Sequence, residues 1–520
     1  MKAIVLVILA LACAAREANA KTPLHRTRPL SYASLGFWWG TGCPDNGRCA
    51  CSPTATTMQE EASCQLDALA KHDFPVDVFL FDGNAWSKAN SFKDNQCRGE
   101  DCCEWKLGDG LIDRMKAQGV RAVLHFWGGC HQDEQYERAH RRLGKVLLGF
   151  YLDDGSSDAE ASRASAFLAR VAPGDSDVVC KAIQGRDDKT SEAFLSSTAN
   201  VSYVGDTHYD WQGLKDGIKR FFTKGPLLPA AFNELTGYWY PKEGTPDEET
   251  VYRRLHWGAV QPIMAHTPFA NMDPWQHGYS AELLAAYRRW AWWHKELTPY
   301  IYSLSIAMHE NPAEPVIRNA SLPNESMQLG PNIFAAFVSD PKVSARDVQL
   351  PPGRWIDVWN EDNVLSGRVK QHPAKPGFEP VFVKEGALLP LQVARPYADH
   401  GTRASADSLT LLAYPAGKST FRYRDHVRNQ WHVFTLKQQG PALSLDAAPR
   451  FRRLPVLLRL GRQKQPPQSV GIKGGRLLVN ATDRIAALPQ VATEDAVNAA
   501  GASCWFFDAQ KRRLIVKWVP

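Results

Sequence analysis

Short apolar segments alternate with amphipathic segments between residues 35 and 308. Several apolar segments are rich in β-branched residues and many close on a polar residue, which is typical of strands. These segments lie at 35–39, 76–82, 121–127, 145–153, 177–182, 201–206, 227–234 and 260–266. Helical periodicity fills the gaps, for example at 57–72, at 157–171 and from Ser280 onward. Eight strand–helix units in about 270 residues predict a (β/α)8 barrel. A doubly wound open sheet is the alternative, but no Gly-rich phosphate turn follows the first strand.

The pattern changes after about residue 311. Helical periodicity fades, and short alternating strands separated by Pro, Gly and Asn appear at 332–340, 346–360, 380–391, 419–425 and 430–437. We therefore predict an α/β protein with a TIM barrel followed by one or two C-terminal β-sandwich domains. The predicted limits are 1–20 for a signal peptide, 21–311 for the barrel, 312–396 for a proximal sandwich and 397–520 for a distal β-rich domain.

The first twenty residues have the features of a secretory signal peptide. Lys2 is followed by the apolar run 3–15, and Ala18-Asn19-Ala20 resembles a cleavage site. A buried N-terminal strand is the alternative. No later apolar stretch is long enough to predict a membrane span. We expect a chain that is secreted or that enters the lumen of the secretory or lysosomal pathway.

Charge and cysteine content narrow the class of protein. A formal charge of +6 over 520 residues, with no concentrated basic block, predicts no nucleic-acid partner. Eleven Cys are present, and Cys13 falls in the predicted signal, so ten remain. Seven of these lie between residues 43 and 103. A metal site is one interpretation of this cluster, but the oxidising route and the absence of finger-like His spacing favour disulfides.

Polar residues close most of the predicted barrel strands. Barrel enzymes place their working residues at the carboxyl ends of strands, so these residues are expected to meet at one mouth. The candidates are Asp82, Trp127, Asp153, Lys181, Asp206, Glu234 and His266. Cleavage of a glycosidic bond needs two carboxyl groups, one ionised and one protonated, and several carboxylates at one rim meet that need.

Asp153 and Asp206 close the fourth and sixth predicted strands. Two carboxyl groups facing each other from these strands could approach the roughly 5 Å that retaining chemistry requires. Position alone leaves Asp153 and Asp154 as alternatives for the nucleophile, and Asp206 could instead cap a helix. Likewise, Asp82 could be a turn residue and His266 a buried core histidine. No two His share a helix face at metal-binding spacing, so we predict neither a catalytic metal nor a cofactor.

Several segments resemble glycoside hydrolase family 31, which contains α-glucosidases and α-xylosidases. WGAVQPIMAHT (257–267) is similar to the family's eighth-strand segment, and DPWQHGY (273–279) is similar to the loop after it. The helix at 287–304 and the C-terminal segments LPPGRWIDVWN (350–360) and PVFVKEGALLPL (380–391) also resemble the family. The resemblance covers about residues 35 to 395.

The resemblance implies roles for individual residues. LLGFYLD (147–153) makes Asp153 the nucleophile, and VGDTHYDW (204–211) makes Asp206 the acid/base. Asp82 and His266 are then expected to hold sugar hydroxyls. Separately, the aromatic residues Trp86, Trp127, Tyr151 and Trp211 could line the pocket or could equally belong to the core. Lys181 stands where an Arg is expected, Glu234 replaces an Asp, and Met264-Ala265 replaces the family's Arg before His266. These departures alter the substrate contacts.

The expected function is a retaining exo-acting α-glycosidase. Its partner would be an oligosaccharide or glycoside carrying a terminal α-linked glucose or xylose. One alternative is a secreted carbohydrate-binding protein that has lost catalysis on the same fold. Another is an α-galactosidase-like activity, since the neighbouring α-galactosidase family shares the barrel and the use of two Asp.

Overall fold

The computed structural model describes most of the chain from residue 29 onward. The described residues are 29–41, 51, 58–81, 107–126, 133–152, 158–171, 178–182, 199–205, 207–224, 230–232, 235, 246–266, 274–275, 278–392, 409–449, 456–481 and 485–519. The predicted signal peptide lies outside them. No helix in the described ranges is both long enough and apolar enough to cross a membrane.

Eight parallel strands form one sheet in the order β7-β6-β5-β4-β3-β2-β1-β8. They are β1 (Phe37–Thr41), β2 (Val78–Phe81), β3 (Arg121–Phe126), β4 (Leu147–Leu152), β5 (Val178–Ala182), β6 (Val201–Tyr203), β7 (Ala230–Phe232) and β8 (Met264–His266). Leu235, just after β7, donates its backbone N–H to the carbonyl oxygen of Ala265 in β8 (3.0 Å). This hydrogen bond connects the two strands at opposite ends of the order, β7 and β8. The predicted (β/α)8 barrel is confirmed.

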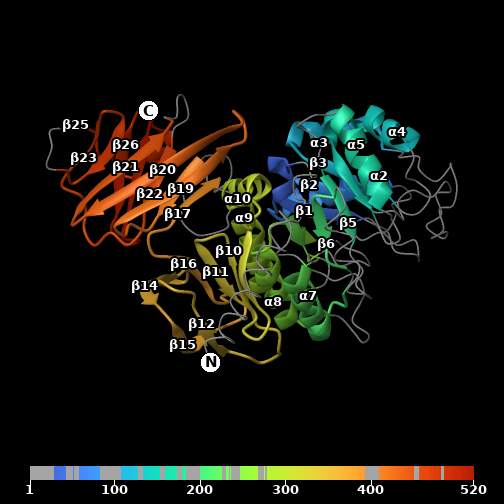
Figure 1. The fold of residues 1–520 in the computed structure, drawn as a ribbon, viewed down its shortest axis with the longest axis horizontal. Coiled ribbons are helices and arrows are strands. Elements are labelled where there is room, and N and C mark those ends of the chain that lie inside the picture. The colour runs from blue at the N-terminus through green and yellow to red at the C-terminus, as the bar shows by residue number, and fades with distance from the viewer. Residues whose placement is uncertain are drawn as a thin grey trace, which may run out of the picture.

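Helices follow the strands and cover the outside of the sheet (Figure 1). They are α2 (Met58–Lys71), α3 (Asp109–Gln118), α4 (Asp133–Leu143), α5 (Asp158–Val171), α7 (Trp211–Lys224), α8 (Glu248–Ala259) and α9 (Ala281–Glu296). Side-chain caps fix two of their starts, since Asp247 accepts from the N–H of Thr250 (3.0 Å) and Ser280 accepts from that of Leu283 (3.2 Å). Short 3-10 turns lie before β1 (η2, Tyr32–Leu35) and before β4 (η5, Gly144–Val146).

The described part of the chain after the barrel is mainly antiparallel β-sheet. One six-stranded sheet has the order β14-β13-β16-β11-β10-β9 and lies beside the two-stranded sheet β12-β15. Their strands are β9 (Ile317–Ser321), β10 (Ser326–Leu329), β11 (Ile333–Ala336), β12 (Ala345–Gln349), β13 (Trp355–Asp357), β14 (Asn360–Leu365), β15 (Arg368–Pro373) and β16 (Val381–Lys384). The predicted change to β-sandwich architecture is confirmed.

Two further sheets form the distal region. A five-stranded sheet has the order β17-β18-β22-β27-β26 and a six-stranded sheet the order β19-β20-β21-β24-β23-β25. Their strands are β17 (Leu388–Gln392), β18 (Leu409–Ala413), β19 (Lys418–Asp425), β20 (Gln430–Gln439), β21 (Ala442–Ala448), β22 (Val456–Leu460), β23 (Val470–Lys473), β24 (Arg476–Val479), β25 (Ala486–Ala487), β26 (Cys504–Asp508) and β27 (Arg513–Trp518); the short helix α11 spans Glu494–Ala499. β17 therefore shares a sheet with strands beyond residue 396, and the domain limits stay predictions.

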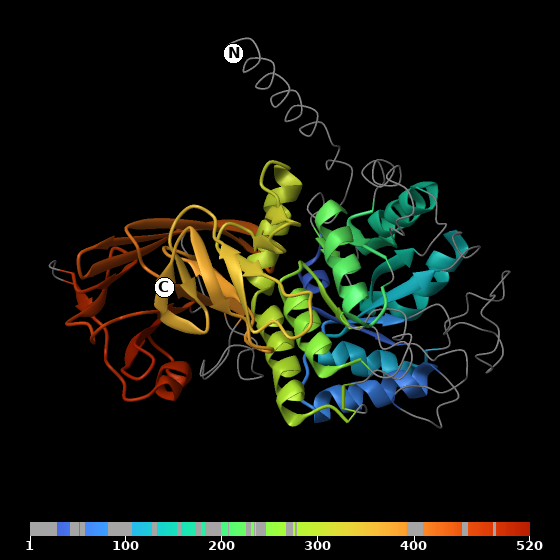
Figure 2. The same ribbon diagram turned by 90° about the horizontal axis from the view of Figure 1, so that it is seen from below.

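Helix α10 (Thr298–Glu310) lies between the barrel and the C-terminal sheets, and Figures 1 and 2 both place it between those parts. Residues 298–308 are all buried. The Tyr300 hydroxyl donates to the Leu329 carbonyl (3.0 Å) and accepts from the N–H of Asn332 (3.2 Å), while the Ser303 hydroxyl accepts from the N–H of Arg424 (3.0 Å). One helix thus contacts both sets of C-terminal sheets.

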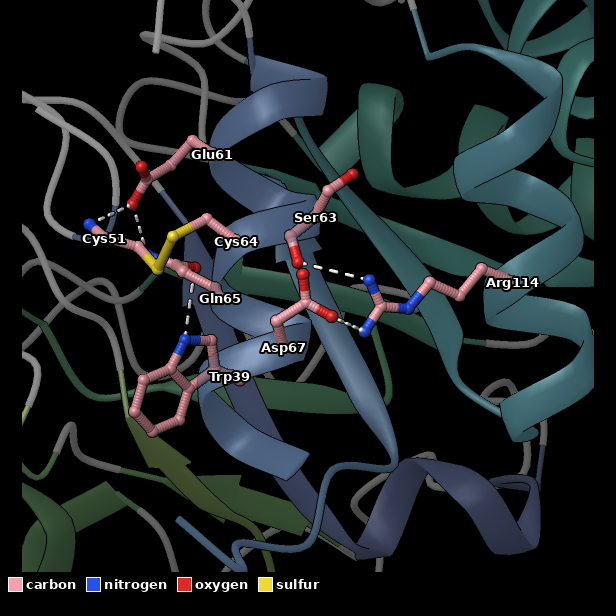
Figure 3. The surroundings of a disulfide bond; sticks show 8 residues. All are labelled: Trp39, Cys51, Glu61, Ser63, Cys64, Gln65, Asp67 and Arg114. Atoms are coloured by element: carbon pink, nitrogen blue, oxygen red, sulfur yellow. Dashed lines mark hydrogen bonds and ion pairs between the residues drawn. A yellow bond between two sulfur atoms is a disulfide. The ribbon is translucent and has the colours of Figure 1, made fainter. Parts of the chain in front are cut away.

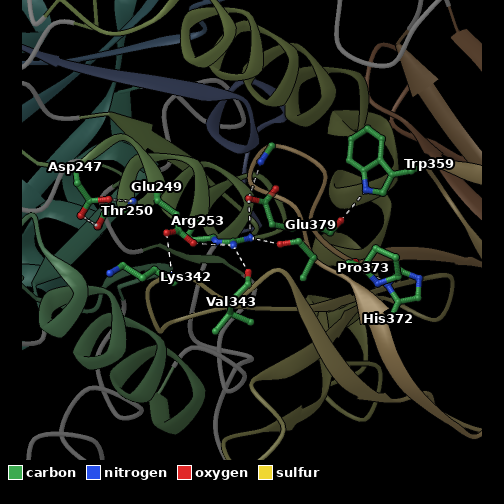
Figure 4. Close-up of polar contacts among 12 residues, drawn as sticks. Asp247, Glu249, Thr250, Arg253, Lys342, Val343, Trp359, His372, Pro373 and Glu379 are labelled. Carbon is green, nitrogen blue, oxygen red and sulfur yellow. Dashed lines mark hydrogen bonds and ion pairs between the residues drawn. The ribbon is translucent and has the colours of Figure 1, made fainter.

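A buried arginine also joins the barrel to the proximal sheets (Figure 4). Arg253 of α8 is fully buried and donates to the carbonyl oxygens of Val343 (2.6 Å) and Ala374 (2.7 Å). It also pairs with two carboxylates, Glu249 at 3.0 Å and the fully buried Glu379 at 3.5 Å. Burial raises the pKa of Glu379 to about 7, although the charge of Arg253 opposes that rise.

Candidate active site

The strand order sets the relation between the two proposed catalytic strands. β5 pairs with β4 on one side and with β6 on the other, through Lys181↔Leu152 and Lys181↔Ser202. The expectation that β4 and β6 are separated by one strand is confirmed. Neighbouring strands lie about 4.8 Å apart, so the backbones of β4 and β6 lie roughly 10 Å apart.

Most of the predicted site residues lie outside the described ranges. These are Asp82, Trp127, Asp153, Asp206 and Glu234. Asp82, Trp127 and Asp153 directly follow the last residues of β2, β3 and β4 along the chain. Lys181 lies within β5, where only its backbone is described. Their roles stay predictions.

A glycine explains how closely β4 approaches β5. A Cβ atom at Gly149 would lie 1.9 Å from the carbonyl oxygen of Val178, a distance that no side chain can occupy. The glycine of the Gly-Phe-Tyr-Leu segment is thus required by the packing of the two strands. It fixes the strand that leads to Asp153.

Aromatic side chains from several strands meet inside the barrel. Tyr151 of β4 contacts His125 of β3 edge to face, with ring centroids 4.7 Å apart, and contacts Tyr203 of β6 at 5.9 Å. Phe232 of β7 packs on Tyr203 at 5.3 Å and on Trp38 of β1 at 5.5 Å. Because contacts such as Tyr151–Tyr203 skip the intervening strand, these rings fill the space enclosed by the sheet.

His266 is described, and its environment is a packed one. It closes β8, is fully buried, and hydrogen-bonds through Nδ1 to the hydroxyl of Tyr287 in α9. Its ring also stacks on Trp39, with centroids 3.9 Å apart. These contacts favour the alternative of a buried core histidine, and the sugar-binding role stays a prediction.

The segment that follows Asp206 is held by a residue that the sequence did not suggest. Gly205 is buried with φ at +98°, a conformation that suits glycine. Arg254 of α8 donates to the carbonyl oxygens of His208 and Asp210, the latter at 3.3 Å, and its guanidinium covers the ring of Tyr209 at 5.4 Å. Burial raises the pKa of the Tyr209 phenol, so this contact is made by a neutral ring.

Trp211 begins α7, and its side chain is half-buried. The indole Nε1 donates to the Asp247 carboxylate at 3.0 Å, and the same carboxylate caps α8. Trp211 therefore ties α7 to the start of α8. Its contact with a substrate stays a prediction.

The expected use of cysteine for disulfides is confirmed at one pair (Figure 3). Cys51 and Cys64 are bonded, with Cα atoms 5.8 Å apart. The buried Glu61 accepts from the N–H of Cys51 (2.7 Å) and from Gln65 (2.8 Å), and Gln65 in turn accepts from the indole of Trp39 (3.1 Å). This chain of contacts connects the Cys-rich segment to β1, beside His266.

Metal-ligating side chains do not gather in the portion of the chain that the structure describes. No group of three or more His, Cys, Asp or Glu there has the arrangement to hold a metal ion.

Comparison with known proteins finds one matching domain and several distant relatives. Residues 303–389 match the glycosyl hydrolase family 31 C-terminal domain. A 1,6-alpha-glucosyltransferase of Sporosarcina globispora is 25% identical over 211 residues, which are 36% of this chain and 16% of that protein. An alpha-xylosidase of Saccharolobus solfataricus is 26% identical over 404 residues, covering 64% of this chain and 54% of that protein. The chain thus spans about half or less of the length of these curated relatives.

Solved structures agree in fold. The cycloalternan-forming enzyme of Listeria monocytogenes, in complex with a pentasaccharide substrate, matches 95% of this chain and 53% of its own, with a TM-score of 0.72 and 17% identity. A family 31 dextranase of Flavobacterium johnsoniae matches 94% of this chain and 70% of its own, with a TM-score of 0.69 and 15% identity. The chain therefore shares the fold of these enzymes, and its residues 303–389 match the C-terminal domain of glycosyl hydrolase family 31.

Proposed function

We propose that this protein is a retaining exo-acting α-glycosidase that removes terminal α-linked glucose or xylose by double displacement. The observation that carries the proposal is the strand order, in which β4 and β6 flank β5. Asp153 and Asp206 follow these two strands. Side chains that extend inward from backbones roughly 10 Å apart can bring their carboxyl groups to the roughly 5 Å typical of retaining enzymes.

In the first step, the Asp153 carboxylate attacks the anomeric carbon while Asp206 donates its proton to the leaving oxygen. The glycosidic bond breaks, the alcohol leaves, and an ester joins the sugar to Asp153. In the second step, the Asp206 carboxylate takes a proton from water, and the resulting hydroxide oxygen attacks the same carbon. The ester breaks, Asp153 is again ionised, and Asp206 again carries a proton.

Substrate contacts are proposed for the residues around this pair. Asp82 and Glu234 would accept hydrogen bonds from sugar hydroxyls, Lys181 would donate one, and His266 would contribute only if its ring leaves Tyr287. Trp127 and Trp211 would provide flat apolar walls for the sugar. Curated relatives act on α-glucosyl or α-xyloside linkages according to their names, which supports this class of substrate.

Replacement of Asp153 tests the nucleophile, and its neighbour provides the matched control. Asp153→Ala should lower kcat for an aryl α-glucoside or α-xyloside by about 10⁴-fold or more, because the covalent intermediate can no longer form. Asp154→Ala removes the adjacent carboxylate and should retain activity within about tenfold of the parent. Both variants are assayed for turnover and, by circular dichroism, for folding.

Two results would end the assignment. One is activity of the folded Asp153→Ala protein within about tenfold of the parent; the other is a first product whose anomeric form, followed by NMR, is inverted. Loss of turnover in Asp154→Ala alone would move the nucleophile to that residue.

A carbohydrate-binding protein without catalysis is the second candidate. The observation that favours it is the altered eighth strand, where Ala265 stands before a His266 that is buried against Trp39 and Tyr287. Sugar binding by calorimetry without release of aglycone from any aryl α-glycoside would support this candidate. An α-galactosidase-like activity is opposed by the family 31 match at residues 303–389.

We also propose that the protein acts outside the cytosol. The Cys51–Cys64 disulfide supports this location, because such bonds persist in oxidising compartments. Expression with the native N-terminus should release a processed chain into the medium. Retention of an unprocessed chain in the cytosol would contradict the location without affecting the proposed chemistry.

A further inference from the structure

The modest net charge of the chain hides an unequal distribution. Residues 409–520 contain eighteen Lys and Arg but only six Asp and Glu, a formal charge of +12. Since the whole chain carries +6, residues 1–408 carry −6. The distal region is therefore strongly basic, whereas the rest of the protein, including the barrel, is acidic. Such a separation of charge favours binding of an anion at one end of the molecule.

A third of these basic residues lie on one face of the sheet β19-β20-β21-β24-β23, in the orange and red part of Figure 1. Along β19, buried Phe421, Tyr423 and Asp425 alternate with residues on the outer face. Strand pairing places residues of β20, β21, β24 and β23 on that same outer face. Six basic residues share it, and we name it the basic sheet face: Lys418, Arg422, Arg424, Lys437, Lys473 and Arg476.

Two lysines on this face stand directly opposite each other. Lys418 of β19 is the cross-strand partner of Lys437 of β20, and both are exposed. Like charges in this position repel and destabilise a sheet. No carboxylate forms an ion pair with either lysine among the residues that the structure describes. An external anion between the two ammonium groups would remove the repulsion.

Two arginines of the face form ion pairs with described acids. Asp446 of β21 pairs with Arg476 at 3.4 Å, and Glu310 at the end of α10 pairs with Arg422 at 3.4 Å. Beside this row of charges is a cavity of about 600 Å³, a size ordinary for a ligand pocket. Its lining includes Asp446, Lys473, Arg476 and Leu478.

We propose that the basic sheet face and its cavity bind an acidic polysaccharide that carries carboxylate or sulfate groups. Successive outward residues on one strand are about 7 Å apart and neighbouring strands about 4.8 Å apart, so the cations form a flat array suited to a chain with repeated anionic groups. Arginine side chains bind such oxyanions through paired hydrogen bonds. The site anchors a polymer away from the catalytic residues, and this binding does not depend on the proposed hydrolysis.

The face fits nucleic acid and membranes less well. Trp431, the aromatic residue on this face in β20, is covered by the guanidinium groups of Arg422 and Arg424, at 4.4 and 5.4 Å from its ring centroid. It therefore offers no open platform for base stacking. Four large apolar residues of the described chain are exposed: Leu322, Phe378, Val427 and Val519. Only Val427, in the turn between β19 and β20, adjoins the face, so the face offers little of the apolar component of a membrane-binding surface.

Binding measurements on the full-length protein test the proposal. The probes are a heparin-derived decasaccharide, an alginate oligomer, a neutral dextran oligomer, a 20-nucleotide single-stranded DNA and vesicles containing anionic lipid. We expect both acidic saccharides to bind with an affinity that falls as salt is added, and dextran to show no such binding. Lys418→Glu/Lys437→Glu should weaken saccharide binding by at least about tenfold.

A matched variant separates this face from general charge. Lys145→Glu/Lys219→Glu makes the same change of charge at exposed positions of the barrel and should leave the affinity within about twofold of the parent. If Lys418→Glu/Lys437→Glu does not fold, Lys418→Gln/Lys437→Gln provides the same comparison. Turnover of a neutral aryl glycoside should be unchanged in each variant, so the binding proposal and the catalytic proposal can fail separately.

The proposal is overturned if both double variants weaken saccharide binding equally, or if neither acidic saccharide binds. It is also overturned if DNA or anionic vesicles bind more tightly than both saccharides at the same salt concentration. Saccharide binding that only the Lys418/Lys437 variants lose would support it.

Discussion

At the residue scale, helix caps and strand ends could be predicted from local sequence, but buried charges could not. The helical periodicity predicted from Ser280 onward is α9, which begins at Ala281 with Ser280 as its cap. By contrast, Arg253 and Arg254 are adjacent in a helix with two acidic residues in its first turn, a pattern typical of an exposed surface. Both are buried because their acceptors come from distant segments, residues 343–379 for Arg253 and residues 208–210 for Arg254. The burial of His266 has the same origin, since Tyr287 belongs to a later helix.

Glu379 should make stability depend on pH. Its carboxyl group keeps its proton up to a pKa of about 7 in the folded protein, against 4.5 for an ordinary glutamate. Between these values the folded state binds more protons than the unfolded state, so the free energy of unfolding falls as pH rises. The full effect is on the order of 3 kcal/mol. We expect Glu379→Gln to flatten this decline between pH 5 and pH 8 in urea denaturation.

The exposed Glu282 provides the control for that measurement. Glu282→Gln should retain the slope of the parent protein. An identical slope in Glu379→Gln would show that this carboxyl group does not titrate in the range.

At the element scale, sequence periodicity predicted all eight barrel strands because each is a short apolar segment between polar ones. α2 and α5 also begin and end within one residue of expectation. Strand partners in the C-terminal sheets could not be predicted, because pairing depends on contacts between residues far apart in the chain. β17 illustrates this. It follows β16 along the chain but lies in a different sheet, where it pairs with β18 beyond residues 393–408.

Arg254 should position the segment after β6 that leads from Asp206 into α7. Arg254→Met removes its bonds to the carbonyl oxygens of His208 and Asp210 and should lower kcat by up to about a hundredfold, with a smaller change in KM. The acid/base limb of the pH–rate profile should also shift. Arg254→Lys should recover part of kcat.

Arg138→Met is the matched control, because Arg138 forms an exposed pair with Glu134 on α4. It should leave both kinetic constants unchanged. Arg254→Met could instead lower only the amount of folded protein and leave kcat per folded molecule and the pH profile unchanged. That result would show that Arg254 has a purely structural role.

The Cys51–Cys64 bond should stabilise the packing of the Cys-rich segment against the middle of α2. Its removal by Cys51→Ala/Cys64→Ala frees a loop with a sequence separation of 13 residues and should lower the free energy of unfolding by about 2–4 kcal/mol. Cys504→Ala removes a buried thiol that forms no disulfide and serves as the comparison. Equal stability of the double variant and the parent would argue against this contribution.

At the scale of the whole molecule, the sequence predicted a barrel followed by β-sheet domains, but not how tightly they are joined. Two features make that junction. Arg253 carries its buried charge into the proximal sheets, and α10 is buried along nearly its whole length between barrel and sheets. Neither feature has a local sequence signature. The uneven charge of the two ends, by contrast, was readable from the sequence once the distal domain was considered alone.

A chain that ends at residue 311 should fail to fold stably. It retains Arg253 and α10 but lacks every proximal acceptor of Arg253 and the sheets that bury α10. Of the partners of Arg253 the fragment keeps Glu249 alone, and the apolar side chains of α10 lose the sheets that cover them. We expect this fragment to be insoluble or to show no cooperative thermal transition, whereas the full-length chain should show one. A soluble fragment with a sharp transition would refute the prediction.

The placement of α10 also bears on how proteins of this fold diversify. Helix α10 contacts the barrel, the proximal sheets and the distal sheets, and it therefore constrains all three. A substitution in this helix must suit the parts of the molecule that pack against it. Recombination that exchanges the barrel alone would inherit mismatched neighbours. New specificities in this lineage are then expected to arise in the loops at the barrel mouth, while the barrel and its C-terminal sheets are inherited together.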